Sequence, residues 1–420
     1  MALDALLSSC CGLDVHSRFV TACVLSGPSQ KPKKDIRSFS STAAGLLELR
    51  DWLIDLGCRA VAMESTGVYW KPVWHLLEGP EFDLVLANAY AVKAVKGRKT
   101  DVGDAEWIAK LHRSGLVPAS FVPPPPIRDL RDLTRYRTAL KQEAARERNR
   151  IQKLLEDANI KLSEVISDIF GKSGRAMLAE LIRTEGRPDA ERVADLAQGR
   201  LRKKIPDLVE ALAGNVRDHH RYMLSLGLQR LSDLERHVAD IEARIDVCLE
   251  PYTAEVELLE TIPGVAHHVA AVIIAEAGAD MSVFPDAPHF AAWAGLTPGN
   301  NQSGGKTRPA HLRPGNRHLR AALVESAWAA SHTRKTFLSA TFWRLAARIG
   351  RKKALIAIAH KQANAIHVIL SKHVAYAELG EAYRRRVDDA RYEQRLIAKV
   401  EALGFRVTRR DAQQTEVVAG

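Results

Sequence analysis

The chain has 420 residues, of which 46% are hydrophobic and 26% charged, values that are ordinary for a globular protein of two or three domains. Its 61 lysines and arginines exceed its 50 aspartates and glutamates, and the net charge of +11 favours a polyanionic partner such as nucleic acid, although a merely soluble basic protein also fits. The five cysteines are odd in number and lack CxxC spacing, which argues against a disulfide framework or a zinc site and for a reducing compartment.

The first 125 residues alternate strand patterns with helical patterns. Residues 10–26 alternate apolar and polar side chains around a turn at residues 16–18, which predicts a β-hairpin. Further strands are expected at residues 59–65 and 82–88, and helices at residues 42–57, 68–79 and 99–115. Strands that alternate with helices after an opening hairpin predict an α/β layer fold.

The proline run at residues 122–126 marks a domain boundary, because it can continue neither a helix nor a central strand. Two helical segments with near-heptad apolar spacing follow it. Their apolar positions are Leu130, Leu133, Leu140, Ile151, Leu154 and Ala158 in the first, and Leu231, Leu234, Val238, Ile241, Ile245 and Cys248 in the second. The spacing predicts an antiparallel coiled coil, with a plain helical hairpin as the alternative. The connector at residues 171–220 is charged and helix-prone, and its pattern indicates no function.

A helix, a Pro-Gly turn and a second helix follow over residues 258–278, a pattern typical of a helix-hairpin-helix. Backbone N–H groups at Gly264 would suit a phosphate, and a simple connection between packed helices is the alternative. Residues 268–279 are the most apolar segment, but they are too short to span a bilayer and contain Glu276. We therefore expect no membrane association and a cytoplasmic protein associated with the nucleoid.

Four carboxylates stand out in the first domain. Asp14 lies inside an apolar strand pattern, Glu64 ends another, and Asp101 and Asp104 lie three residues apart on one helical face. A carboxylate in a buried strand is unfavourable unless a cation compensates it, and oxygen ligands suit magnesium or manganese. Each residue also has a structural alternative, because Asp101 could cap a helix and Asp104 could face water. The combination predicts a metal site of the ribonuclease-H-like kind.

A single serine, Ser303, lies between two asparagines and two glycines in a segment without carboxylates from residue 287 to residue 324. Glycines allow the close approach of a DNA backbone, and nearby cations could neutralise phosphates. The candidate phosphate-binding residues are Lys306, Arg308, Arg313, Arg317 and Arg320. Attack by Ser303 on phosphorus would leave a covalent phosphoserine link, which conserves the bond for rejoining strands. The alternative is a glycine-rich loop in which the serine caps a turn.

Six segments of the chain together resemble the transposases of the one-ten insertion-sequence class. The resemblance covers roughly residues 10–165 and 255–335. The segments are GLDVHSRFVTACVL, MESTGVYWKPVWHLLE, KTDVGDAEWIAKLHRSGLVPASFVPP, LRDLTRYRTAL with RNRIQKLLEDANIKL, TIPGVAHHVAAVIIAEAG and GLTPGNNQSGG. Each motif is moderately specific, and their joint order is highly specific.

The resemblance implies a ribonuclease-H-like (RuvC-like) N-terminal domain with an Asp-Glu-Asp-Asp quartet, here Asp14, Glu64, Asp101 and Asp104. It also implies a coiled-coil middle and a mainly α C-terminal transposase domain with a nucleophilic serine, here Ser303. The implied partners are donor and target double-stranded DNA and a non-coding bridge RNA that pairs with both. The implied assembly is a homo-oligomer, a dimer or a tetramer, whose active sites combine residues of different protomers.

We therefore expect a RuvC-like catalytic domain at residues 1–125, a coiled-coil and connector domain at 126–250, a serine-bearing domain at 251–375 and a tail at 376–420. The expected function is excision and insertion of an insertion sequence by transesterification. Two alternatives stay open: a RuvC-like hydrolytic nuclease in which water attacks, and a nucleic-acid-binding protein without catalysis.

Overall fold

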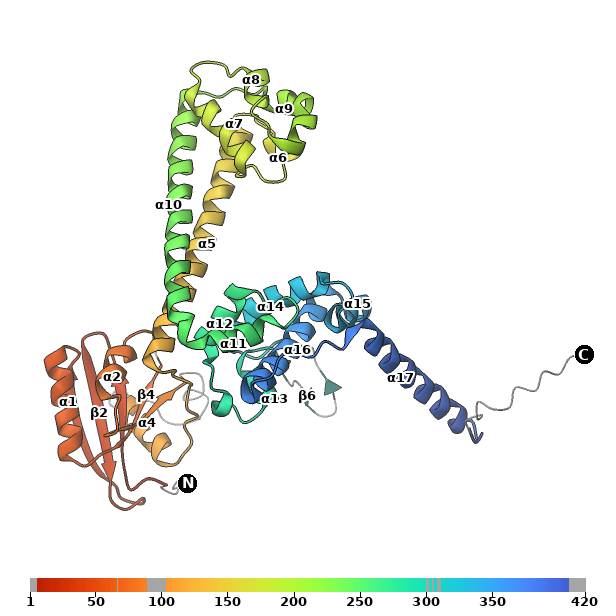
Figure 1. The fold of residues 1–420 in the computed structure, drawn as a ribbon. Helices are drawn as coiled ribbons and strands as arrows, with labels where there is room; N and C mark the ends of the chain where they lie inside the picture. The colour runs from red at the N-terminus through yellow and green to blue at the C-terminus, as the bar shows by residue number, and fades with distance from the viewer. Residues whose placement is uncertain are drawn as a thin grey trace, which may run out of the picture. The chain divides into compact units, whose positions relative to one another are not determined.

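A computed structural model describes residues 6–65, 67–88, 103–299, 302–303, 306–307 and 311–407. The chain forms two compact units, residues 1–122 and residues 123–420. The first unit is a mixed α/β structure, and the second is almost entirely helical (Figure 1). Within the described residues, no helix combines the length and apolar character that crossing a bilayer requires.

The first unit contains a five-stranded sheet in the order β3-β2-β1-β4-β5. The first three strands in the chain pair antiparallel, whereas β4 pairs parallel with both β1 and β5. The strands are β1 (Ser9–Val15), β2 (Phe19–Ser26), β3 (Lys33–Ser40), β4 (Ala60–Glu64) and β5 (Asp83–Ala87). The helices are α1 (Ala43–Asp55), α2 (Trp70–Leu77) and α4 (Gly103–Arg113).

The two faces of this sheet are covered by different helices. Cys11, Leu13 and Val15 of β1 share a hydrophobic core with residues of α1 and α2. The alternate residue Cys10 instead packs with Ala105 and Ala109 of α4. Because successive side chains of a strand point to opposite faces, α4 covers the face opposite to α1 and α2. The α/β layering that the alternating patterns predicted is confirmed.

Strand β3 was not predicted from the sequence. It lies at the edge of the sheet, and Phe39 is its single buried residue among eight. The apolar alternation that marks a half-buried strand is therefore missing. Backbone pairing with β2, from Phe19 opposite Ser40 to Ser26 opposite Lys33, holds the strand in place.

The second unit begins with two long helices, α5 (Pro125–Asp157) and α10 (Asp218–Leu249). They form an antiparallel hairpin, because Arg137 pairs with Glu242 near one end while Asp157 contacts His220 at the other. The connector between them contains α6 (Leu162–Val165), α7 (Lys172–Arg183), α8 (Ala190–Ala194), the 3-10 helix η1 (Gly199–Lys204) and α9 (Ile205–Leu212). These short helices lie at one end of the helical hairpin (Figure 1), and they share a hydrophobic core with it.

The other end of the hairpin joins a helical C-terminal core. Ile127 and Leu130 of α5 and Ile245 and Leu249 of α10 belong to that core. Its elements are η2 (Glu250–Tyr252), α11 (Thr253–Glu260), α12 (His267–Ala277), η3 (Met281–Val283), α13 (Ala287–Trp293), β6 (Gln302–Ser303), β7 (Lys306–Thr307), α14 (Arg317–His332), α15 (Phe337–Ile349), α16 (Arg351–Lys372) and α17 (Gly380–Ala402). Residues 408–420 of the predicted tail lie outside the described residues.

Gly264 lies in the turn between α11 and α12, with a φ of +87°. A Cβ atom at this position would come within 2.3 Å of the Ser326 carbonyl oxygen and 2.5 Å of the Ala330 nitrogen. The glycine is therefore required by close packing against α14, as well as by its left-handed backbone. Phosphate binding at this turn stays a prediction.

Candidate active site

Two of the predicted carboxylates lie next to each other in the sheet. Strands β1 and β4 are parallel and pair Leu13 with Met63, so that the following residues, Asp14 and Glu64, occupy neighbouring positions. Adjacent strands are about 5 Å apart, so both carboxylates lie close together at the carboxyl ends of these two central strands. Asp14 also accepts a hydrogen bond from His16, whose Nε2 atom lies 3.0 Å from Asp14 Oδ2.

Helix α4 covers the sheet face that carries these two residues. A Cβ atom on Gly12 would lie 2.2 Å from the Ala105 carbonyl oxygen, so the backbones of β1 and α4 are almost in contact there. Cys10 Sγ donates to the Ala109 carbonyl oxygen at 3.3 Å, which means that α4 runs opposite to β1. The first turn of α4, with Asp104, therefore lies toward Asp14.

The fourth predicted carboxylate, Asp101, lies outside the described residues. Among the residues that the structure describes, no three His, Cys, Asp or Glu side chains form a group that could hold a metal ion. Asp14, Glu64 and Asp104 nevertheless offer carboxylate oxygens, the donor type that magnesium and manganese prefer. These residue types fit such a cation.

Two other carboxylates of this unit differ in position from the quartet. Asp83 pairs with Ala60 at the start of β5, whereas Glu64 pairs with Ala87 at the end of that strand. Asp83 therefore lies at the opposite end of the strands from Glu64. Glu106 forms ion pairs with Lys34 at 2.6 Å and with Lys110 at 2.5 Å. Position in the sheet therefore distinguishes Asp83 from Asp14 and Glu64, and Glu106 is engaged by two lysines.

Ser303 belongs to a short β-hairpin in the second unit. It pairs with Lys306 of β7, and Gln302 pairs with Thr307. Further from the tip of this hairpin, the Gly299 nitrogen donates to the His311 carbonyl oxygen at 2.9 Å. We call residues 297–313 the serine hairpin. Its side chains at Ser303 and Lys306 and the whole of Arg308 lie outside the described parts of the structure.

Two glycines close the base of the serine hairpin. A Cβ atom on Gly315 would lie 2.4 Å from the Gly295 nitrogen and 2.7 Å from the Trp293 carbonyl oxygen. Gly295 itself has a φ of +73° and lies near the guanidinium group of Arg320. Any side chain at position 315 would force these two chain segments apart.

The remaining predicted phosphate-binding residues flank this base. Arg313 is exposed in the returning segment, and Arg317 is exposed in the first turn of α14. Arg320 is partly buried, one turn further along the same helix. These three cations lie on one continuous segment that leads out of the serine hairpin.

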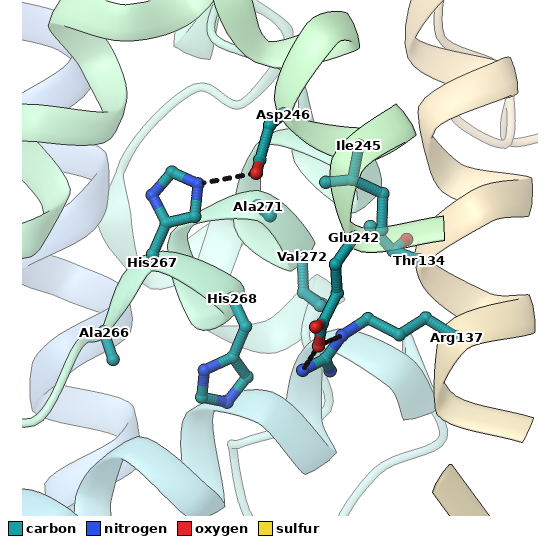
Figure 2. Close-up of a pocket in the computed structure, with 10 residues that line it drawn as sticks. All are labelled: Thr134, Arg137, Glu242, Ile245, Asp246, Ala266, His267, His268, Ala271 and Val272. Carbon is teal, nitrogen blue, oxygen red and sulfur yellow. Dashed lines mark hydrogen bonds and ion pairs between the residues drawn. The ribbon is translucent and has the colours of Figure 1, made fainter. Parts of the chain in front are cut away.

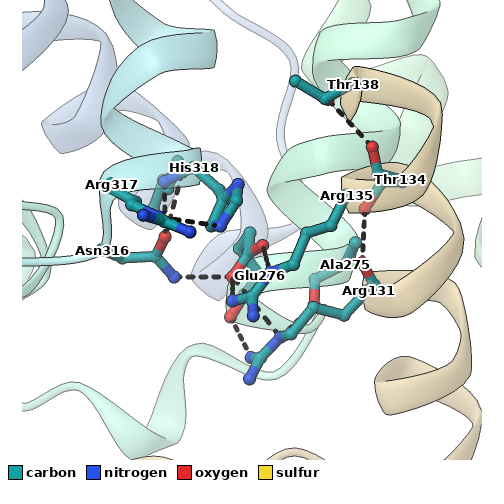
Figure 3. A network of polar contacts seen from close by, with 10 residues as sticks. Arg131, Thr134, Arg135, Thr138, Ala275, Glu276, Asn316, Arg317 and His318 are labelled. Carbon is teal, nitrogen blue, oxygen red and sulfur yellow. Dashed lines mark hydrogen bonds and ion pairs between the residues drawn. The ribbon is translucent and has the colours of Figure 1, made fainter. Parts of the chain in front are cut away.

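A buried network anchors the start of α14, as Figure 3 shows. Glu276 of α12 is fully buried, and its carboxylate accepts two hydrogen bonds from Arg135 of α5, at 2.7 and 2.8 Å. The same carboxylate accepts a hydrogen bond from Asn316 Nδ2 at 2.7 Å. Asn316 caps α14 by accepting hydrogen bonds from the backbone of His318 and Leu319. The network therefore connects α5, α12 and the N-terminus of α14, just beyond the serine hairpin.

The electrostatics of this network favour an ionised Glu276. Burial by itself raises the pKa of Glu276, but hydrogen bonds from Arg135 and Asn316 outweigh it and hold the pKa below its ordinary value. Arg131 adds a contact of 3.4 Å to the carboxylate and donates to the carbonyl oxygen of Glu276 at 2.6 Å. Glu276 is thus a paired buried charge.

Comparison with known proteins identifies the family. A family model described as a transposase matches residues 11–160, and a model described as "Transposase IS116/IS110/IS902 family" matches residues 256–342. Together the two matches cover more than half of the chain and include the carboxylates of the sheet and Ser303. The chain belongs to this transposase family. Membership assigns it to a class of enzymes that cut and join DNA.

Two curated relatives agree with this transposase assignment. A "Probable family 20 transposase" of Pseudomonas aeruginosa is 24% identical over 340 residues, which are 78% of this chain and 89% of the relative. The "Insertion element IS110 uncharacterized 43.6 kDa protein" of Streptomyces coelicolor is 30% identical over 217 residues, which are 45% of this chain and 50% of the relative.

The transposase also has a cavity of about 310 Å³ between α5, α10 and α12, shown in Figure 2. His267, at the start of α12, contacts Asp246 at 3.1 Å and Glu260 at 2.9 Å, one with each ring nitrogen. Burial lowers the pKa of His267, but the hydrogen bonds to Glu260 and Asp246 raise it above its ordinary value overall. His267 thus joins α10, α11 and α12.

The network around Glu276 was not predicted from the sequence, although a signal was present. Glu276 is the single carboxylate in an apolar segment, as Asp14 is in its strand. A lone buried carboxylate needs a compensating partner, and this reasoning applies equally to both residues. The partner Arg135 is 141 positions away in the chain, so no local pattern could identify it.

Proposed function

We propose that this transposase cuts and rejoins DNA with a magnesium or manganese site formed by Asp14, Glu64, Asp101 and Asp104 and with Ser303 as nucleophile. The observation that carries the proposal is the position of Asp14 beside Glu64 on the sheet face covered by α4. The designation of the matched N-terminal model, DEDD, also agrees with four acidic residues.

Each part of the site has a distinct role. The carboxylates hold divalent cations, which when bound would polarise a scissile phosphate and help to ionise a hydroxyl. Ser303 attacks phosphorus as its hydroxyl gives up a proton to water. The DNA oxygen leaves with the electron pair of the broken bond and takes up a proton, so that one ester bond and one hydroxyl are exchanged for another pair. Lys306, Arg308, Arg313, Arg317 and Arg320 bind backbone phosphates, since their segment contains no carboxylate to compete.

Two structural assignments belong to the same proposal. We infer a ribonuclease-H-like fold for the first unit, supported by its mixed five-stranded sheet with helices on both faces. We infer coiled-coil packing for α5 and α10, supported by buried positions spaced mainly three and four apart. Those positions include Ala144, Glu147, Ile151 and Leu155 on α5, and Leu224, Gly227, Leu231, Leu234 and Val238 on α10.

We further infer that the proposed partners are donor and target double-stranded DNA and a bridge RNA. Base pairing by the RNA would select the sequence, while the protein binds backbone and shape. The net charge of +11 supports a polyanionic partner. The assembly is a dimer or tetramer in which the carboxylate site of one protomer meets Ser303 of another.

The carboxylate site is tested with Asp14→Asn and a matched control, Asp83→Asn, at the opposite end of the strands in the same sheet. Asp14→Asn should reduce DNA cleavage by at least about a hundredfold and weaken Mn²⁺ binding in calorimetry, because it removes one metal ligand. Asp83→Asn should leave both unchanged. If Asp14→Asn leaves cleavage and Mn²⁺ binding intact, a non-catalytic binding protein becomes the better assignment.

The nucleophile is tested with Ser303→Ala and with Thr307→Ala, which removes another hydroxyl from the same hairpin. Ser303→Ala should abolish the protein–DNA adduct seen after denaturation, and Thr307→Ala should retain it. Strand cleavage that persists in Ser303→Ala would support the alternative, a hydrolytic nuclease in which water attacks.

A further inference from the structure

The charge of the C-terminal helices is one-sided over a long segment. Residues 326–377 contain no aspartate or glutamate, although an average of 50 acidic residues in 420 would place about six in a segment of this length. The same segment contains nine cations: Arg334, Lys335, Arg344, Arg348, Arg351, Lys352, Lys353, Lys361 and Lys372. Such a charge balance favours the binding of a polyanionic partner to these helices.

Two large aromatic side chains are exposed on the same helices. Trp328 of α14 is 48% exposed, and its ring lies 4.6 Å from that of His332. Trp343 of α15 is 49% exposed, and its indole N–H donates to the Ser331 carbonyl oxygen at 3.2 Å. Both indoles are therefore positioned at the last turn of α14.

Cations adjoin this aromatic surface. The guanidinium carbon of Arg351 lies 5.8 Å from the ring centre of Trp343. Arg348, Lys352 and Lys353 are exposed in the same turn between α15 and α16. Stacking platforms beside exposed cations are the combination with which proteins bind unpaired nucleotides, since the bases of a duplex offer no free faces.

We propose that Trp328, Trp343 and the basic turn at residues 348–353 bind single-stranded DNA. The tryptophans stack on bases, and the turn neutralises phosphates. Trp328 lies eleven residues from Arg317 along α14, or about 16 Å from the start of the helix that follows the serine hairpin. The surface would hold the strand released at Ser303, and this identification of the strand rests on the proposed function.

The test measures the affinity of the full-length protein for a labelled oligothymidylate, for a duplex of equal length and for oligouridylate. Trp328→Ala should weaken oligothymidylate binding about tenfold and leave duplex binding within twofold, because only unpaired bases stack. Trp343→Phe should retain most of the affinity. Tyr222→Ala removes another exposed aromatic ring, on α10, and should change nothing.

The binding of phosphates has a separate readout. Replacing both Lys352 and Lys353 with glutamine should reduce the slope of log affinity against log salt concentration by about 0.7 for each phosphate that the variant no longer neutralises. Thermal denaturation of every variant identifies any that is unfolded, and Trp343→Phe and the lysine variants keep the test independent of the packing of Trp328.

Four results would overturn the inference: unchanged oligothymidylate binding in Trp328→Ala, an equal loss for duplex, tighter binding of oligouridylate than of oligothymidylate, or an altered oligomeric state with normal DNA binding. Tighter binding of oligouridylate would indicate an RNA site, and an altered oligomeric state with normal DNA binding would indicate a protein interface. Ser303→Ala should bind oligothymidylate normally. The proposal that Ser303 is the nucleophile and the proposal that this surface binds single-stranded DNA can therefore be refuted independently of each other.

Discussion

Gly12 shows how one residue without a side chain sets the geometry of the carboxylate site. A Cβ atom at this position would approach the backbone of α4 to 2.2 Å at Ala105 and 2.4 Å at Ala109. Backbone atoms cannot move aside as the end of a flexible side chain can. The close approach of β1 and α4, and with it the position of Asp104 relative to Asp14, depends on this glycine.

We predict that Gly12→Ala destabilises the protein by about 1–3 kcal/mol, because overpacking forces α4 away from the sheet. The control is Gly79→Ala in the same unit, where a Cβ atom would meet only the carboxylate end of Glu81. Urea denaturation provides the measurement. Equal midpoints for the two variants would contradict the tight contact between β1 and α4.

His267 predicts a pH-dependent contribution to stability. Its pKa is raised in the folded protein, so its contribution is complete below the unfolded value of about 6.5 and is lost as the pH rises through the folded value. His267→Gln should therefore lower the melting temperature most at pH 5.5 and least at pH 9. His237→Gln, at an exposed position of α10, is the control. A difference that grows with pH would refute the assigned ion pairs.

At the scale of elements, Glu276 joins three segments that are distant in the chain. Its carboxylate binds Arg135 of α5 and Asn316 before α14, and its own helix is buried on nearly every side. A wholly buried helix offers few polar groups, so the Glu276 carboxylate supplies the directional contact that orients α5 and the start of α14 relative to α12. The same carboxylate holds Asn316, the N-cap of α14, just beyond the serine hairpin.

Removing that carboxylate should be strongly destabilising. We predict that Glu276→Ala lowers the free energy of unfolding by about 3 kcal/mol, near the lower limit for a broken buried pair, because Arg135 is 38% exposed and keeps some water. Glu242→Ala removes a half-exposed partner of Arg137 and should cost less than about 1 kcal/mol. Similar losses in the two variants would show that Glu276 does not hold these elements together.

The elements that the sequence predicts well have a local apolar pattern. Strands β1, β2, β4 and β5 and helices α1, α2 and α4 occur where periodicity indicated them, within a few residues. Strand β3 was missed because its single buried residue, Phe39, gives no pattern. In α5, buried Thr134 and Glu147 interrupt the apolar spacing, which explains why its heptads looked imperfect.

At the scale of the whole molecule, the proposed chemistry combines residues from both compact units. Asp14, Glu64 and Asp104 belong to the first unit, and Ser303 belongs to the second. Residue type and context made these residues candidates, and the family resemblance was needed to favour Ser303 as a nucleophile over a turn cap. The sequence predicted that Asp14 and Glu64 share a metal site, but the pairing that makes them neighbours was not predictable, because their strands are separated in the chain by two other strands and a helix.

The central claim is that Ser303 becomes covalently linked to DNA in a reaction that needs the carboxylates. The most direct measurement is mass spectrometry of peptides from a denatured, nuclease-treated reaction. The account predicts a nucleotide attached to the peptide that contains Ser303, present with Mg²⁺ in the unmodified protein and absent from Asp14→Asn. Efficient strand exchange without such an adduct, or an adduct on a different residue, would contradict it.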